Sequence, residues 1–274
     1  MIDCSLSRVA AVLSIAQKAS DAIVEIYTQY TQNNRPEIIR KEDNSPVTQA
    51  DLLAHQIIVQ GLTQLQPQFP ILSEESTACD YLTRRQWESY WLVDPLDGTR
   101  EFLAHNGEFT VNIALIHQGK PVIGVVIAPV SQTAYFASQD IGAFKQQHNL
   151  PAVPIKTRQF DSNHIIVTTS RHHGSTSEKM TSFLNTYFSH YQLINLGSSL
   201  KFCQIAEGIA DFYPRLGPTS EWDTAAAQCI LEQAGGILVD FNQQPLRYNQ
   251  KESLLNPEFL AAGDKAMLEI LQKG

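Results

Sequence analysis

The sequence predicts a layered protein of the α+β or α/β class, in which helices pack on an antiparallel sheet that is followed by a second, mixed sheet with its own helices. Three observations support this prediction. Two amphipathic segments precede a series of closely spaced β-rich runs, and beyond about residue 155 β-rich and helical patterns alternate. The 274 residues are 43% hydrophobic and 18% charged, which is typical of a globular protein with a substantial core.

The first half of the chain begins with two expected helices. From Leu6 to Tyr30 apolar residues recur at three- and four-residue steps, which predicts a helix with one buried face. A second helix is expected from about Thr48 to Leu65. The β-rich runs that follow are separated by short turns and predict an antiparallel meander; they are Phe109–His117, Lys120–Ala128 and Thr133–Ala137.

The stretch from Lys145 to Asn163 contains two prolines and little periodicity, and we expect a boundary there. It divides the chain into an N-terminal α+β domain, residues 1–155, and a C-terminal α/β domain, residues 156–274. The strands expected in the second half are His164–Thr168, Tyr191–Asn195 and Ala210–Arg215, and the helices are Thr176–Phe188, Ser199–Glu207 and Trp222–Ala234.

Charge and cysteine content exclude several kinds of protein. A net charge of -8 argues against binding a nucleic-acid polymer, which needs a basic face, although bound metal would still allow a small anion to bind. The four cysteines form no Cys-x-x-Cys pair, so a zinc site and a disulfide framework are not expected, and a reducing cytoplasm fits. The short apolar run Val9–Ala16 favours an amphipathic helix over a signal peptide, and no segment reaches the length of a membrane span.

The densest chemical signal is the segment Trp91–Thr99, where an apolar strand runs into two carboxylates around a proline. The proline fixes its own φ, and Gly98 permits a sharp turn. Asp94 and Asp97, with the carbonyl of Leu96 between them, offer the hard oxygen ligands that magnesium prefers. The alternative is an ordinary Asp-Pro turn with solvated acids.

Acids mark three further element ends. Glu74 and Glu75 follow a short apolar run, and the alternative is that they are exposed acids at the start of a helix or loop. Asp223 lies in the first turn of an expected helix, where an acid serves as a cap or where the free N–H groups bind a phosphate. Asp51 stands three residues after a threonine, which is also a passable capping box.

Taken together, these blocks resemble the lithium-sensitive, magnesium-dependent phosphomonoesterases of the inositol monophosphatase superfamily. Their order carries the resemblance: Asp51, Glu74-Glu75, Asp94-Pro-Leu-Asp-Gly-Thr, then Trp222-Asp223 with Gly235-Gly236 beyond. The resemblance covers nearly the whole chain and implies an αβαβα sandwich of the sugar-phosphatase type. Within the superfamily the chain looks most like the bacterial 3'(2'),5'-bisphosphate nucleotidases, especially in Asn106–Leu115, Gly197–Cys203 and Tyr213–Pro218.

The resemblance implies a site with two or three magnesium ions, held by oxygens of Glu74, Asp94, Leu96, Asp97 and Asp223. Asp94 and Asp97 would serve two ions, and Asp223 would complete the second. Asp51, Glu74 and Thr99 would orient and deprotonate the attacking water in an in-line displacement. Capping alone remains the alternative role for Asp51.

The same resemblance implies substrate-binding residues: Gly98, Thr99, Ser198, Lys201, Arg215, Asp223 and a histidine from His172-His173. Which of the two histidines contacts substrate is left open, and a solvated side chain is the alternative for Lys201. Near Arg215 an inositol monophosphatase would usually present an acid that binds a sugar hydroxyl. That acid is missing, which favours a doubly anionic substrate over a sugar.

The expected activity is hydrolysis of adenosine 3',5'-bisphosphate (PAP) to AMP and phosphate, linked to sulfate assimilation. 3'-Phosphoadenylyl sulfate (PAPS) is a second candidate substrate, and lithium inhibition is expected by resemblance. One alternative is an inositol or other sugar phosphatase of the same superfamily. Another is a non-catalytic nucleotide or metal sensor. A monomer or weak homodimer, and peripheral association with the inner membrane, are left open.

Overall fold

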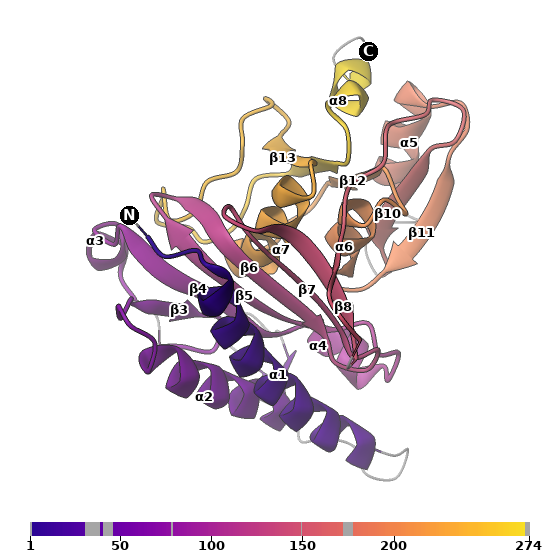
Figure 1. Cartoon of the computed structure of the whole chain (residues 1–274). Coiled ribbons are helices and arrows are strands. Elements are labelled where there is room, and N and C mark those ends of the chain that lie inside the picture. The colour runs from indigo at the N-terminus through magenta and orange to yellow at the C-terminus, as the bar shows by residue number, and fades with distance from the viewer. Residues whose placement is uncertain are drawn as a thin grey trace.

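The computed structural model describes residues 2–30, 39–40, 46–77, 79–148, 150–171 and 178–271. Helices and sheets alternate in five layers (Figure 1). Two long helices cover one face of a large sheet, two more helices fill the space between this sheet and a smaller one, and the last helices cover the outer face of the smaller sheet. The predicted αβαβα sandwich and its mixed second sheet are confirmed. The first sheet, predicted to be antiparallel, is mixed as well, because β3 pairs in parallel with β4 at its edge.

The large sheet contains seven of the described strands. The first two, β3 and β4, run parallel, and every later neighbour runs antiparallel. Its central strands are buried on both faces, which explains their nearly continuous apolar sequences. In spatial order the strands are β3 (Ile71–Ser73), β4 (Ser89–Asp97), β5 (Thr110–His117), β6 (Lys120–Ala128), β7 (Thr133–Ser138), β8 (Gly142–Gln147) and β9 (Val153–Pro154).

The outer layer consists of α1 (Leu6–Gln29) and α2 (Gln49–Thr63), which pack against each other and against the large sheet. Ser5 caps α1 by accepting a hydrogen bond from the backbone N–H of Arg8. The apolar stripe of α1 is buried, as its periodicity predicts. The remaining described elements of this half are short: β1 (Ile39–Arg40), β2 (Pro46–Val47), α3 (Tyr81–Arg84) and α4 (Thr99–Leu103).

The smaller sheet is mixed, because β10 runs parallel to two neighbours whereas β14 runs antiparallel to its own two. Its described strands, in spatial order, are β11 (Gln192–Leu196), β10 (Ile166–Ser170), β12 (Phe212–Arg215), β14 (Phe259–Ala262) and β13 (Ile237–Asp240). The helices of this half are α5 (Glu178–Tyr187), α6 (Leu200–Ala206), α7 (Glu221–Gln233) and α8 (Lys265–Leu271).

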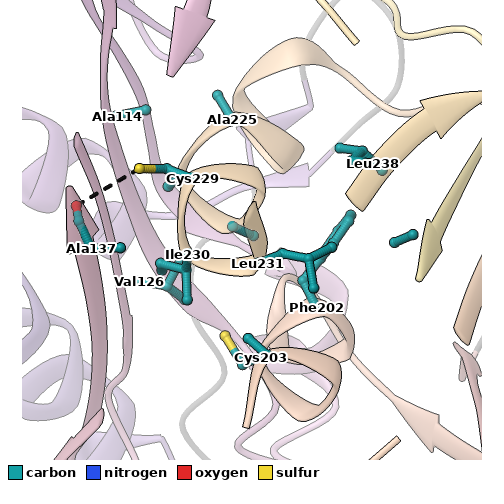
Figure 2. Packing of buried hydrophobic residues seen from close by; sticks show 14 of the residues in the cluster. Ala114, Val126, Ala137, Phe202, Cys203, Ala225, Cys229, Ile230, Leu231 and Leu238 are labelled. Carbon is teal, nitrogen blue, oxygen red and sulfur yellow. Dashed lines mark hydrogen bonds between the residues drawn. The ribbon is translucent and has the colours of Figure 1, made fainter. Parts of the chain in front are cut away.

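The middle layer depends on α7, whose buried side chains join the two sheets in one hydrophobic cluster (Figure 2). Ile230 and Cys229 face Val126 and Ala137 of the large sheet, and the Cys229 thiol lies 3.8 Å from the Ala137 carbonyl oxygen. Gly124 makes the close approach feasible, because a Cβ there would lie 2.2 Å from the carbonyl oxygen of α7 residue 226. The helix therefore sits directly on the sheet.

Most expected elements lie within two or three residues of their predicted bounds. The predicted domain boundary falls directly after β9. The division into two domains stays a prediction, and the hydrophobic cluster around α7 contains side chains from both sides of the boundary. Strands β8, β9, β13 and β14 and helix α8 were not expected. None of the described helices combines the length and the apolar character needed to cross a membrane.

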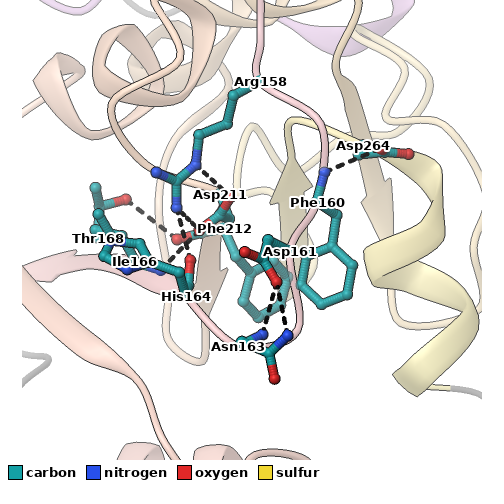
Figure 3. A network of polar contacts seen from close by, with 10 residues as sticks. All are labelled: Arg158, Phe160, Asp161, Asn163, His164, Ile166, Thr168, Asp211, Phe212 and Asp264. Atoms are coloured by element: carbon teal, nitrogen blue, oxygen red, sulfur yellow. Dashed lines mark hydrogen bonds and ion pairs between the residues drawn. The ribbon is translucent and has the colours of Figure 1, made fainter.

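An ion pair between partly buried Arg158 and buried Asp211 holds the chain where it enters the second half (Figure 3). Asp211, just before β12, accepts hydrogen bonds from the guanidinium of Arg158, with the Nε–Oδ1 distance at 2.6 Å, and from the N–H of Ile166 at 2.7 Å. The Arg158 guanidinium also donates to the carbonyl of His164. The Asp211 carboxylate is thus shared between the segment that leaves the large sheet and the first strand of the small one.

We predict that Asp211→Ala lowers the free energy of unfolding by about 3 kcal/mol, because it leaves a buried amide and a partly buried guanidinium without their acceptor. Urea denaturation followed by circular dichroism measures this change. Asp161→Ala is the matched control, since Asp161 is exposed and its carboxylate accepts hydrogen bonds from Asn163, two residues along the chain. Equal losses in the two variants would contradict a structural role specific to Asp211.

Candidate metal-dependent active site

Two strand ends bring the first acids together. Because β3 and β4 are parallel, with Ser73 opposite Val93, their carboxyl ends meet at the same edge of the sheet. Glu74 follows β3 directly, and its N–H donates to the Val93 carbonyl at 3.1 Å. Its carboxylate therefore lies beside that of Asp94 in β4. The paired-strand register alone thus places the predicted Glu74 and Asp94 in one site.

The Asp-Pro-Leu-Asp segment forms an irregular end of strand β4. Asp94 is buried and accepts a hydrogen bond from the Leu96 N–H at 3.0 Å, while the register of β4 with β5 shifts between Asp94 and Asp97. Gly98 has a φ of 95°, a left-handed conformation that allows α4 to start immediately at Thr99. The irregular strand end thereby directs both carboxylates toward the same cavity.

Asp51 combines the two roles that the sequence left open. Its Oδ2 atom accepts from the Thr48 N–H at 2.9 Å and from the Thr48 hydroxyl at 2.6 Å, which is the capping box of α2. Its Oδ1 atom accepts from the Thr99 hydroxyl at 3.0 Å. The cap therefore holds the carboxylate in the orientation in which it accepts a hydrogen bond from Thr99.

Asp223 enters the site from the second half of the chain. It is the third residue of α7, and its Oδ2 atom accepts from the Ser220 N–H at 2.8 Å, so it caps the helix as expected. It also meets the acids of the large sheet: one carboxylate oxygen each from Glu74, Asp94 and Asp223 lie within 4.8 Å of one another. Capping and clustering are again compatible.

The remaining predicted residues gather around a cavity of about 400 Å³. Its described lining includes Glu74, Asp94, Leu96, Asp97, Gly98, Thr99, Ser198, Lys201, Arg215 and Asp223. Asp51 is not part of this lining and reaches the cavity through Thr99. Lys201 is buried and donates to the Leu196 carbonyl at 3.3 Å and to the Ser198 carbonyl, with its ammonium 5.3 Å from the centre of the Tyr213 ring. His172 and His173 lie outside the described residues.

Burial and mutual repulsion shift the ionisation of the acids. Burial, reinforced by Glu74 and neighbouring aspartates, raises the pKa of Asp94 and of Asp223 well above the usual value. Burial raises the pKa of Asp97 to about 6, against the opposing effect of Lys201. Burial likewise raises the pKa of Asp51 and lowers that of Lys201 to about 8. Protein groups alone therefore do not compensate the negative charge of the cluster.

This donor set fits magnesium. Several carboxylates and the Leu96 carbonyl converge on one cavity, and hard oxygen atoms of this kind are its preferred ligands. A divalent cation would also supply the positive charge that the buried acids lack. The predicted ligands therefore form a chemically suitable site.

Sequence reasoning missed the polar residues that support the acids. Ser199 and Asn112 are buried, and both contact the carboxylate of Asp97, at 3.2 and 3.4 Å. Glu101 also lines the cavity. The available signal was the location of Ser199 and Asn112 in two of the three segments that carry the strongest family resemblance, Gly197–Cys203 and Asn106–Leu115.

The family comparison agrees with this fold and site. The model of the inositol monophosphatase family matches residues 6–273, so the chain belongs to the inositol monophosphatase family.

Within the family, the chain is 47% identical over 249 residues to the 3'(2'),5'-bisphosphate nucleotidase CysQ of Salmonella typhimurium, covering 90% of this chain and 96% of that protein. The crystal structure of CysQ from Bacteroides thetaiotaomicron is similar with a TM-score of 0.81 at 40% identity, covering 94% of this chain and 97% of that one. The Thermotoga maritima IMPase, at 22% identity and a TM-score of 0.77, shares the fold over 97% of this chain and 96% of its own.

We predict that the metal-free protein loses stability as the pH rises from about 5 to about 7. A carboxyl group whose pKa is higher in the folded state than in the unfolded state, where it is about 3.9, binds protons more tightly when folded, so ionisation opposes folding. For Asp97 this loss occurs between about pH 4 and its folded pKa of about 6, and Asp94 and Asp223 shift in the same direction.

Thermal unfolding in a chelator, repeated at each pH with magnesium, measures this effect. Magnesium is expected to raise the melting temperature most at pH 7, and Asp97→Asn is expected to weaken the pH dependence of the metal-free protein. A metal-free melting temperature that climbs steadily from pH 5 to pH 7 would contradict the electrostatic account.

Proposed function

We propose that this chain is a magnesium-dependent 3'(2'),5'-bisphosphate nucleotidase that hydrolyses adenosine 3',5'-bisphosphate to AMP and phosphate, with PAPS as a second substrate. The observation that carries the proposal is the convergence of Glu74, Asp94 and Asp223 beside a cavity that also contains Lys201 and Arg215. Similarity to the CysQ nucleotidases over most of the chain supports the substrate class and a role in sulfate assimilation.

The site would hold two or three magnesium ions. One ion would be bound by Glu74, Asp94, Leu96 and Asp97. Another would be bound by Asp94, Asp97 and Asp223. When bound, magnesium supplies Lewis-acid activation of the phosphoryl group and neutralises its charge. The protein residues orient the reactants, and fixing their positions accounts for much of the rate.

Thr99 and Asp51 form the proton-accepting pair. The Thr99 hydroxyl lines the cavity and donates to Asp51 Oδ1, so its oxygen can accept a proton from an attacking water while its own proton moves to the carboxylate. Burial raises the pKa of Asp51, which makes its carboxylate a stronger base. Glu74 lies at the same edge and shares in orienting the water.

The cationic side of the cavity suits a second phosphate. The Arg215 guanidinium donates to the carbonyls of Gly217 and Pro218, at 3.2 and 2.7 Å, and these bonds hold it at the cavity wall. A guanidinium and an ammonium are appropriate for a phosphate that is bound but not cleaved. We include Ser198, Gly98 and one of His172 and His173 among the substrate contacts.

We predict that Asp97→Ala abolishes magnesium-dependent turnover and leaves a cooperative fold. The loss in kcat/KM should exceed about 100-fold, because removing only the partners of metal ligands already costs about 10–100-fold. Phosphate release from adenosine 3',5'-bisphosphate measures it. Asp140→Ala, at an exposed acid away from the cavity, is the control and should keep its activity. Undiminished turnover in Asp97→Ala would rule out the proposed metal site.

We predict that Arg215→Met raises KM for the bisphosphate by about 10-fold or more, since a hydrogen bond to a charged group contributes about 1.5–3 kcal/mol. KM for adenosine 3'-monophosphate should change little, because that substrate lacks the second phosphate. Arg247→Met is the control at an exposed arginine. Equal effects on both substrates, or faster hydrolysis of inositol 1-phosphate by the unmodified protein, would refute the specificity and favour the sugar-phosphatase alternative.

A further inference from the structure

A chain of buried hydrogen bonds connects the two halves of the protein behind the acidic cluster. It joins the segment Asn106–Leu115 to the segment Gly197–Cys203. Each segment contains one residue without a role in the proposed chemistry, Asn112 in the first and Ser199 in the second. Neither residue lines the cavity, and both are about 1% exposed. They therefore act on the site only through its other residues.

The donors and acceptors in this chain have a defined direction. The Thr110 hydroxyl donates its one proton to Asn112 Oδ1 at 3.0 Å. In its other contact, 3.1 Å to the Ser198 hydroxyl, Ser198 must therefore be the donor. Asn112 Nδ2 then donates to Ser199 Oγ at 3.0 Å, and Ser199 donates to the Asp223 carbonyl at 2.8 Å. The hydroxyls of Thr110 and Ser199 therefore each accept one bond and donate one in this chain.

The end of this chain lies between two acids that approach from different layers. Ser199 Oγ is 3.2 Å from Asp97 Oδ2 as well as 2.8 Å from the Asp223 carbonyl. Asn112 faces Asp94 across the β4–β5 ladder, and its amide is 3.4 Å from Asp97 Oδ2. The pair thus links the strand that carries Asp97 to the first turn of α7, although the two carboxylates repel each other.

We propose that Ser199 and Asn112 are positioning residues that hold Asp223 against Asp97 and so determine the affinity for the second magnesium ion. The inference rests on the proposed metal site. The ion shared by Asp94, Asp97 and Asp223 is the one whose ligands come from both halves of the chain, so it depends on their spacing. The ion bound by Glu74, Asp94, Leu96 and Asp97 has its ligands on the ends of neighbouring strands and needs no such link.

Magnesium binding measured by isothermal titration calorimetry, without substrate, tests this inference. Ser199→Ala is expected to weaken the binding of one ion about 10-fold and to leave the other nearly unchanged. Turnover should recover toward the unmodified kcat when the magnesium concentration is raised. Asn112→Ala should weaken the same ion, and the double variant should lose less than the sum of both effects, because the two residues act through one hydrogen-bonded link.

Ser138→Ala is a matched control, because Ser138 is also buried and also donates to a backbone carbonyl, that of Cys4 at 2.6 Å. It should lower the melting temperature and leave the magnesium titration unchanged. If Ser199→Ala does not fold, Ser199→Cys keeps the size of the side chain with a weaker donor and should give an intermediate affinity.

Folded Ser199 variants that bind both ions as tightly as the unmodified protein would overturn the inference. So would equal weakening of both ions, which indicates general loosening of the site. A third outcome would separate the two proposals: the protein binds two ions, Ser199→Ala weakens the binding of one of them, and the unmodified protein does not hydrolyse the bisphosphonucleotide. That outcome would refute the proposed function and leave the positioning role intact.

Discussion

The structure depends on holding several carboxylates closer together than their mutual repulsion favours. Glu74, Asp94 and Asp223 come from a strand end, an irregular strand and a helix start, and each is held by its own local structure. The caps of α2 and α7 hold Asp51 and Asp223 by backbone N–H groups, so the residues that begin these helices also face the site. The raised pKa values of Asp94 and Asp223 express the electrostatic cost of this arrangement, which a divalent cation would offset.

The layered fold supplies the rigidity that this arrangement needs. Helix α7 lies between the two sheets, so the position of its first turn is determined by the packing of its whole buried body. Gly124 lets the helix approach the large sheet closely, and any side chain there would push α7, and Asp223 with it, away from the β4 acids. A residue far from the chemistry thus affects the geometry of the acids through close packing.

Much of the fold and most of the acids could be predicted from the sequence, because the relevant signals are local. Strands buried on both faces give continuous apolar runs bounded by turns, as in Lys120–Ala128, and acids at element ends are visible in the sequence. Strands β13 and β14 have only four residues each and pair with partners distant in the chain, and β9 has only two residues. Segments this short show little hydrophobic periodicity in the sequence. Ser199 and Asn112 were missed because their contacts are with residues far away in the sequence. The spacing of residues along the chain does not reveal such contacts.

The distribution of charge in the cavity also bears on the order in which ligands bind. Acids and cations share the lining of the cavity: Lys201 is held by backbone carbonyls, and burial lowers its pKa to about 8. Without bound metal, these carboxylates would repel a doubly phosphorylated nucleotide, although the same carboxylates are the proposed metal ligands. Cations bound by the acids would reverse the sign of the local field and add to the positive charge of Arg215 in the same lining. Metal ions would therefore convert an acidic cavity into one that is complementary to two phosphates, and on this electrostatic argument we expect magnesium to bind before the substrate.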